Sequence, residues 1–193
     1  ARKISVTPAI PLYGRSADNL RDHRHVTSLL HRIKTSENGV ICKPVLSFDE
    51  RGHQKNNMIY YVAGSTENGE NPVSFFPTVA SFIGESGTFL APEALAKNQK
   101  GCGAGKEFAG EEALGAMTFA EIMLAPGQAQ EYIVVSGMTE SEEEITRTAE
   151  AFHTKEQADA AFIKAKEYWN GLVNISFETG NPKEDSYLKW ICF

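Results

Sequence analysis

The sequence predicts a mainly β domain, an antiparallel sandwich with one or two helices late in the chain. Short runs that are apolar throughout or that alternate between apolar and polar residues recur along most of its length. These runs do not alternate with helical segments, which argues against a parallel β/α arrangement. At 193 residues, of which 41% are hydrophobic, the chain has the size and composition of one sandwich domain.

Five segments have the composition of strands and are separated by turn residues. They are residues 39–48, 58–63, 116–124, 131–137 and 172–177. Between the third and fourth segments, Pro126 is followed by Gly127, a pair that favours a type II turn. We therefore expect this turn to join two adjacent antiparallel strands.

The helical signals lie late in the chain, in an insertion near residues 141–169. Ser141 can cap a helix whose first turn carries three glutamates, and residues 155–169 repeat apolar side chains at helical spacing. Residues 84–110 are rich in Gly, Ala and Lys without a clear period, which predicts a long surface loop with a helical turn near residues 92–98.

Charge and composition exclude several classes of function. The net charge is −6, from 25 acidic and 19 basic residues, so nucleic acid is not an expected partner. No apolar run approaches the roughly 20 residues that cross a bilayer, and no signal peptide is recognisable. The three cysteines are widely spaced, which predicts reduced thiols and a cytoplasmic protein.

One stretch concentrates more polar chemistry than any other, and we call it the polar strip. Its candidate substrate-binding residues are Arg15, Asp18, Asn19, Arg21, Asp22, His23, Arg24 and His25, with His31 close behind in the sequence. Arginine forks, imidazoles and carboxylates can bind sugar hydroxyls or an oxyanion. A metal site and a purely structural rim that pins a loop are the alternatives.

The remaining motifs do not predict a self-contained active site, a metal site or a bound cofactor. Residues 101–106 lack the first glycine and the final Ser or Thr of a phosphate-binding loop. The glutamates at 111–112 and 142–144 are contiguous, which is typical of solvated surface. Of the many aromatic residues, Phe75 and Phe76 stand beside a proline and are expected to be the most exposed.

Several segments together resemble the bacterial cellobiose-phosphorylase family of inverting glycoside phosphorylases, formerly grouped with the glycosyltransferases. Within that family, the first two matching stretches, residues 13–30 and 44–53, look most like the 1,2-β-oligoglucan phosphorylases, and cellodextrin-type members are the next most similar. The segments that carry the resemblance are residues 13–30, 44–53, 82–87, 124–127 with 132–135, and 168–179.

The resemblance implies a fold and a division of labour. It implies a β-supersandwich of the galactose-mutarotase type over residues 1–180, with residues 181–193 beginning a linker helix toward a catalytic (α/α)6 barrel that lies beyond the chain, which would make this chain a cut piece. In such enzymes an Asp of the barrel is the general acid and inorganic phosphate is the co-substrate, so no residue here inherits a catalytic role. The implied partners are a β-glucooligosaccharide, the barrel and, in the full-length enzyme, a second copy.

Three hypotheses for function follow. The first is a non-catalytic domain that supports the barrel, the dimer contact and the active-site entrance of such a phosphorylase. The second is a stand-alone carbohydrate-binding module, indicated by the aromatic residues and the polar strip. The third is a mutarotase-like sugar epimerase with His23 or His25 as acid or base.

Overall fold

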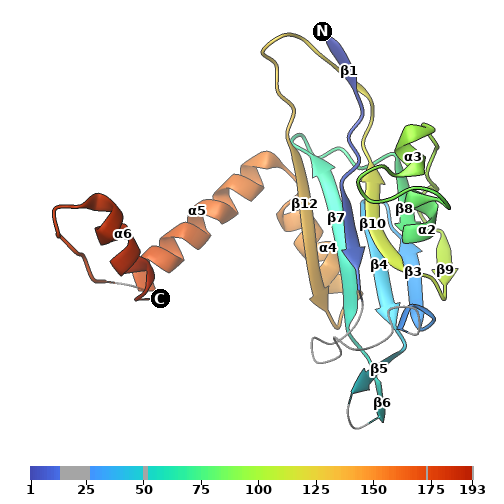
Figure 1. The fold of residues 1–193 in the computed structure, drawn as a ribbon, viewed down its shortest axis with the longest axis horizontal. Coiled ribbons are helices and arrows are strands. Elements are labelled where there is room, and N and C mark those ends of the chain that lie inside the picture. Colours follow the sequence, from blue (N-terminus) through green and yellow to red (C-terminus); the bar gives the residue numbers. More distant parts are fainter. Residues whose placement is uncertain (14–26, 50–51, 173, 193) are drawn as a thin grey trace. The chain divides into compact units, whose positions relative to one another are not determined.

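The computed structural model describes residues 1–13, 27–49, 52–172 and 174–192. The chain forms two compact units, Ala1–Lys155 and Glu156–Phe193. The first unit is built from antiparallel sheets, and Figure 1 shows its strands packed in layers. The predicted fold class, mainly β and antiparallel, is confirmed.

The large sheet has five strands in the order β12-β7-β4-β3-β9, and every neighbouring pair is antiparallel. Along β3, alternate side chains are buried, as the period of a strand requires. The strands are β3 (His31–Thr35), β4 (Gly39–Pro44), β7 (Ile59–Thr66), β9 (Glu107–Ala109) and β12 (Tyr132–Thr139).

The small sheet has three strands in the order β2-β10-β8, also antiparallel. Its central strand β10 is buried along five of its six residues, because both of its faces are covered. The strands are β2 (Ala9–Leu12), β8 (Ser74–Thr78) and β10 (Ala113–Thr118).

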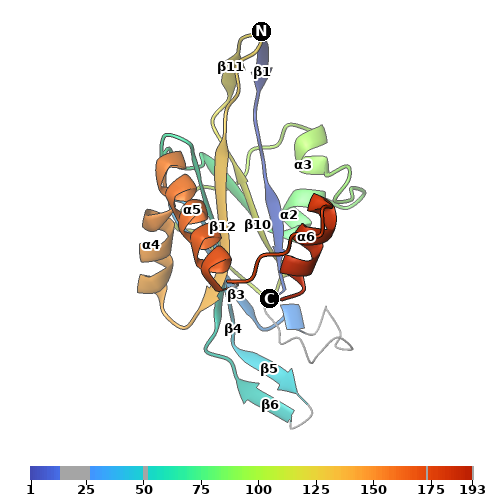
Figure 2. The same cartoon turned by 90° about the vertical axis from the view of Figure 1, so that its left-hand side faces the viewer.

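Two further pairs of strands lie at opposite ends of the sandwich (Figures 1 and 2). One is β1 (Arg2–Ile4) with β11 (Ile122–Leu124), and the other is β5 (Leu46–Asp49) with β6 (Gly52–Lys55). Each pair stands alone as a two-stranded ribbon, which is marginally stable by itself and depends on the main sheets.

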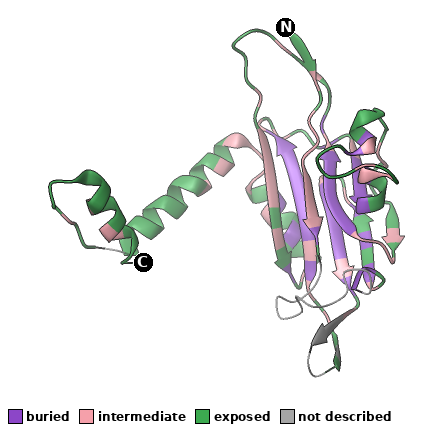
Figure 3. Ribbon diagram, in the orientation of Figure 1, coloured by how far each residue is buried: buried purple, intermediate pink, exposed green. Residues whose placement is uncertain are grey.

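Of the helices whose bounds are described, three belong to the first unit, and two more follow them in the chain. Helix α2 (Val79–Ile83) begins at a capping box in which Thr78 and Ser81 bond each other's backbone. The other helices are α3 (Glu93–Ala96), α4 (Glu142–Ala151), α5 (Lys155–Leu172) and α6 (Pro182–Trp190). No side chain of α5 or α6 is buried, and Figure 3 shows both helices almost entirely exposed.

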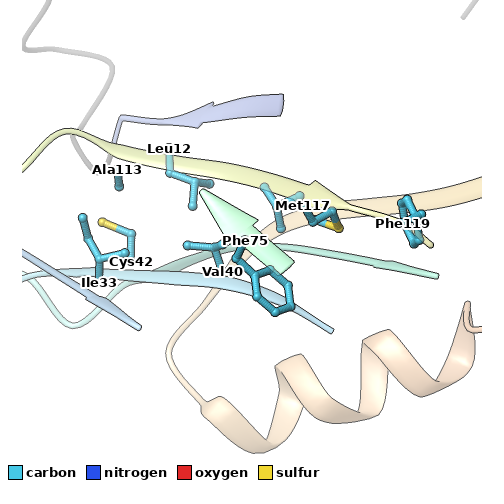
Figure 4. Close-up of a cluster of buried hydrophobic side chains, with 9 residues drawn as sticks. Leu12, Ile33, Val40, Cys42, Phe75, Ala113, Met117 and Phe119 are labelled. Carbon is cyan, nitrogen blue, oxygen red and sulfur yellow. The ribbon is translucent and has the colours of Figure 1, made fainter. Parts of the chain in front are cut away.

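The main core lies between the two sheets. Figure 4 shows Leu12 and Met117 of the small sheet on the opposite side of this core from Val40 and Cys42 of the large sheet. The sheets approach so closely that a Cβ added at Gly115 would come within 2.5 Å of Cγ2 of Val62. Phe75 and Phe119, each at most 2% exposed, also belong to this cluster.

The outer faces of both sheets are covered by helices. Phe76 and Leu114 pack with Phe82 of α2, and the rings of Phe76 and Phe82 lie 5.7 Å apart. On the other side, Tyr61 of the large sheet packs with Ile145 of α4. The unit is therefore layered as helix, small sheet, large sheet and helix.

Several expectations about single segments are corrected. The predicted last strand is wrong, because Leu172 ends helix α5 and the described residues 174–177 form no strand. Phe75 and Phe76 are only 2% and 3% exposed, since their strand lies between two packed layers.

The turn at Pro126 and Gly127 is confirmed, but its expected topology is wrong. The Gln128 amide donates to the Ala125 carbonyl at 3.1 Å, and Gly127 has φ of 80°, as the third position of a type II turn requires. However, the strands before and after it do not pair with each other. Strand β11 pairs with β1, and β12 pairs with β7.

The helical predictions are confirmed with one difference. Helices α4 and α5 form over the residues 141–169 that were expected to be helical, and α3 forms the expected turn in the 84–110 segment. The Ser141 side chain makes no capping hydrogen bond, although the helix begins directly after it.

The close packing of β4 on β7 can be tested at Gly39. A Cβ at this position would lie 2.0 Å from the Val62 carbonyl oxygen, which belongs to the backbone and cannot move aside. We expect Gly39→Ala to lower the free energy of unfolding by about 1–3 kcal/mol, as overpacking does. Gly103→Ala is the control, because nothing lies within 4 Å of its added Cβ. Urea unfolding measures both, and equal stability of the two variants would contradict this packing.

Candidate functional site

The residues of the polar strip lie outside the described residues. This holds for Arg15, Asp18, Asn19, Arg21, Asp22, His23, Arg24 and His25. Their predicted contact with substrate, and the epimerase role considered for His23 or His25, therefore stay predictions. His31, the last histidine of the same stretch, is described and leads to a cavity.

This cavity, which we call the His31 pocket, has a volume of about 230 Å³. An imidazole, that of His31, and a carboxylate, that of Glu112, line it together with the aromatic side chains of Tyr13 and Phe89. The rest of its lining is Pro11, Leu12, Ser28, Val79 and Ala113.

The pocket lies where the two sheets end. Ala113 pairs with Leu12 on one side and with Thr78 on the other, so three strands of the small sheet stop at the same level. His31 is the first residue of β3 in the large sheet. Thus the pocket occupies the gap between the sheets, beyond the last layer of the apolar core.

His31 is held in one orientation and one tautomer. Its side chain is 3% exposed, and Nδ1 lies 3.1 Å from the Glu111 carbonyl oxygen. Because a carbonyl can only accept a hydrogen bond, Nδ1 must carry the proton of the neutral ring. Nε2 is then a hydrogen-bond acceptor, and it makes no hydrogen bond within the described residues.

Burial determines the protonation of this imidazole. Desolvation lowers the pKa of His31 from its ordinary value of 6.5, although hydrogen bonds with the backbones of Glu111 and Tyr13 and the charge of Glu112 oppose this effect. The buried ring is therefore neutral in neutral solution. A neutral imidazole next to a carboxylate can bind hydroxyl groups, since both offer acceptors.

A tight turn holds Phe89 at the pocket. Thr88 and Ala91 exchange backbone hydrogen bonds of 3.2 and 3.1 Å, and the Thr88 hydroxyl also accepts from the Ala91 amide. Phe89 and Leu90 are the two central residues of this turn. Phe89 lines the pocket, whereas Leu90 is 99% exposed and does not.

A carboxylate anchors the loop that carries this turn. Glu93 accepts hydrogen bonds from the side chain of Lys97 at 2.7 Å and from the Ser86 amide at 3.2 Å. The hydrogen bonds from Lys97 and then Ser86 lower the pKa of Glu93 to about 2. The loop on both sides of Phe89 is thus fixed to the start of α3.

Two larger hollows lie on the outer face of the large sheet beside α4. Their volumes are about 450 and 440 Å³, and both are lined by Lys34, Ile41 and Glu142. The ion pair of Lys43 with Glu142 crosses the first of them. Charges of both signs on exposed side chains neutralise each other here, so this surface offers less selectivity than the His31 pocket.

The glycine loop at residues 101–106 has a structural role. Cys102 and Phe75 exchange backbone hydrogen bonds of 2.8 and 2.9 Å. The fully buried Thr35 hydroxyl donates to the Gly103 carbonyl at 2.9 Å and accepts from the Lys106 amide at 2.9 Å. These bonds tie the loop to both sheets.

In the part of the chain that the structure describes, no three His, Cys, Asp or Glu side chains are grouped so that they could hold a metal ion. No described helix is both long and apolar enough to span a bilayer. The three cysteines are free, as their spacing predicts.

Glu112 is the functional candidate that sequence reasoning missed. The contiguous pair Glu111 and Glu112 was interpreted as solvated surface, yet both residues are partly buried. The sequence did contain one indication that Glu112 is partly buried, because this residue directly precedes the continuously apolar segment that forms the buried strand β10. Which residues lie across from it could not be known without the pairing of the strands.

The protonation of His31 gives a prediction for stability. In the unfolded chain the His31 imidazole binds a proton near pH 6.5, whereas in the folded chain it does so only at lower pH. The free energy of unfolding should therefore fall as pH drops below about 6.5. In His31→Gln this contribution disappears, and the loss of stability between pH 7.5 and 5.5 becomes smaller. Urea unfolding at the two pH values measures it. An unchanged difference in His31→Gln would contradict the buried neutral ring.

Comparison with known proteins agrees with this architecture. The family model described as the glycosyl hydrolase 94 supersandwich domain matches residues 1–155, which coincide with the first compact unit. No curated protein matches the sequence. The chain therefore belongs to the glycosyl hydrolase 94 family, of which it carries the supersandwich domain.

Proposed function

We propose that this chain is the non-catalytic sandwich domain of a glycoside phosphorylase. The whole enzyme would cleave β-glucooligosaccharides with inorganic phosphate, reversibly and with inversion at the anomeric carbon. The observation that carries the proposal is the match of residues 1–155 to the supersandwich domain of glycosyl hydrolase 94. The motifs at residues 13–30 and 44–53 point within that family to the 1,2-β-oligoglucan phosphorylases.

The composition of the pocket supports a role other than bond cleavage. Phosphorolysis needs cationic or other donor groups that hold the phosphate beside a general acid. Among the described residues that line the His31 pocket, none is Lys or Arg, and the one carboxylate is Glu112. We therefore assign the reacting groups to another domain of the enzyme.

The second unit supports a role as connector. Phe162, Trp169 and Leu172 recur at helical spacing on α5 and are 53–71% exposed. A helix face of this kind is stable in solution when another domain covers it. We infer that α5 and α6 lead toward the catalytic barrel, and α6 lies entirely within residues 181–193, the expected start of the linker.

Two further parts of the proposal concern assembly and location. The sandwich would contribute to the entrance of the active site and to a homodimer contact of the full-length enzyme. Its free cysteines, one of them fully buried at Cys42, suit the reducing cytoplasm.

An activity assay tests the proposal. The purified 193-residue chain is incubated with inorganic phosphate and β-1,2- or β-1,4-linked glucooligosaccharides, and α-glucose 1-phosphate, the product of inversion, is measured. We expect no product above that of the heat-denatured protein, because the proposal places the general acid and the phosphate-binding groups in another domain of the enzyme. A parallel reaction without phosphate detects hydrolysis. Formation of α-glucose 1-phosphate that depends on native protein and on phosphate would show that the domain is itself catalytic.

A further inference from the structure

We propose that the hollow of about 440 Å³ beside α4, which we call the α4 hollow, binds a short neutral oligosaccharide. The domain would then hold part of a glucan on the outer face of its large sheet. The choice of a sugar among polyhydroxylated ligands rests on the proposed function, whereas the size, polarity and charge of the ligand follow from the hollow.

Three segments that are far apart in the sequence form the walls of the α4 hollow. They are residues 36–38 between β3 and β4, Asn71 between β7 and β8, and α4 with His153 just beyond its end. All of them lie within the first compact unit. The hollow is therefore a product of the tertiary fold of the sandwich.

Hydrogen bonds and close packing hold these walls in place. The Ser36 hydroxyl donates to Oδ1 of Asn38 at 3.0 Å. The Ser65 hydroxyl donates to the His153 carbonyl at 2.7 Å, and a Cβ added at Gly69 would lie 2.9 Å from Cδ2 of His153. A site whose walls are fixed before binding loses little entropy when a ligand enters.

The walls offer both kinds of hydrogen-bonding group. The Asn71 amide and the Lys34 ammonium can donate, and the carboxylates on the walls accept. Within the described residues, the exposed side chains of Lys34, Asn71 and Glu150 make no hydrogen bond or ion pair of their own. The same holds for Glu37. A hydroxyl group both donates and accepts, so a ligand that carries several hydroxyls can bond with donor and acceptor walls at once.

Charge favours a neutral ligand. The hydrogen bond from Lys43, together with the charges of Lys43 and Lys34, lowers the pKa of Glu142, which is therefore ionised and already paired. Of the unpaired groups, a small anion would meet the carboxylates of Glu37 and Glu150, whereas a small cation would meet the ammonium of Lys34. Mixed charges of this kind select poorly among ions, yet all of them can bond to sugar hydroxyls.

The floor and the size of the hollow favour more than one sugar ring. Ile41 and Ile145, both buried and in contact within one cluster, line the hollow and offer an apolar surface to the C–H groups of a sugar face. The volume falls within the roughly 300–1,000 Å³ of sites for drug-sized ligands. The neighbouring hollow of about 450 Å³ shares Lys34, Ile41 and Glu142 with it, so a longer chain can continue along the sheet.

Titration of the full chain with β-1,2- and β-1,4-glucotriose tests the site by calorimetry and saturation-transfer NMR. We expect millimolar dissociation constants, because the exposed groups exchange bonds with water for bonds with sugar. Asn71→Ala and Glu150→Gln should each weaken binding by about three- to tenfold, since each removes a hydrogen-bond partner from a wall. Thermal unfolding of each variant verifies that it is folded.

The chain offers a matched control for each variant. Asn68→Ala changes the same loop as Asn71→Ala, and Glu143→Gln changes the same helix as Glu150→Gln. Neither Asn68 nor Glu143 lines the hollow. Binding that weakens in the two wall variants and not in the two controls supports the site, as does an affinity that changes little with added salt.

Other outcomes would overturn the inference. These are absence of binding at millimolar trisaccharide, equal affinity in all four variants, equal affinity for glucose and for the trisaccharides, and displacement of the sugar by inorganic phosphate. The phosphorolysis assay is read separately. An active chain contradicts the proposed function whether or not the hollow binds sugar, whereas an inactive chain that binds no sugar contradicts only the α4 hollow as a binding site.

Discussion

The structure depends on the close contact between its two sheets. Gly115 of the small sheet lies against Val62 of the large sheet, at a distance that leaves no space for a methyl group. Gly64 repeats this arrangement, because a Cβ there would lie 2.6 Å from the sulfur of Met117. A glycine opposite a large side chain in each layer lets the sheets pack at interior density. The covering helices, the loops and the pocket all take their positions from this interface.

The His31 pocket follows from the same contact. Core side chains fill the space between the sheets up to Leu12 and Ala113, and beyond them the strands end while the gap continues. Polar groups can be buried there because β3 places His31 at the end of its inward face. The rigid frame keeps the imidazole and the carboxylate of Glu112 in fixed positions. Such preorganisation favours recognition of a small ligand, since little entropy is lost on binding.

The sequence was sufficient for the fold class and for several elements, yet not for the site. Alternation and turn residues identify β7 and β12, and the glutamates after Ser141 identify the start of α4. Strand β8 was missed because burial on both faces removes the alternation, which also explains why Phe75 and Phe76 were wrongly expected at the surface. Glu112 became a candidate only when the strand pairing placed it beside His31, 81 positions away in the sequence.

Amide hydrogen exchange, followed by mass spectrometry, tests the central role of the interface between the sheets most directly. The account predicts the slowest exchange in β4, β7 and β10, and fast exchange in α5 and α6, whose side chains are all at least partly exposed. In Gly115→Ala, exchange should accelerate in both sheets together, because they are stabilised by one shared contact. Acceleration confined to the small sheet, or strands that exchange as fast as α5, would contradict it.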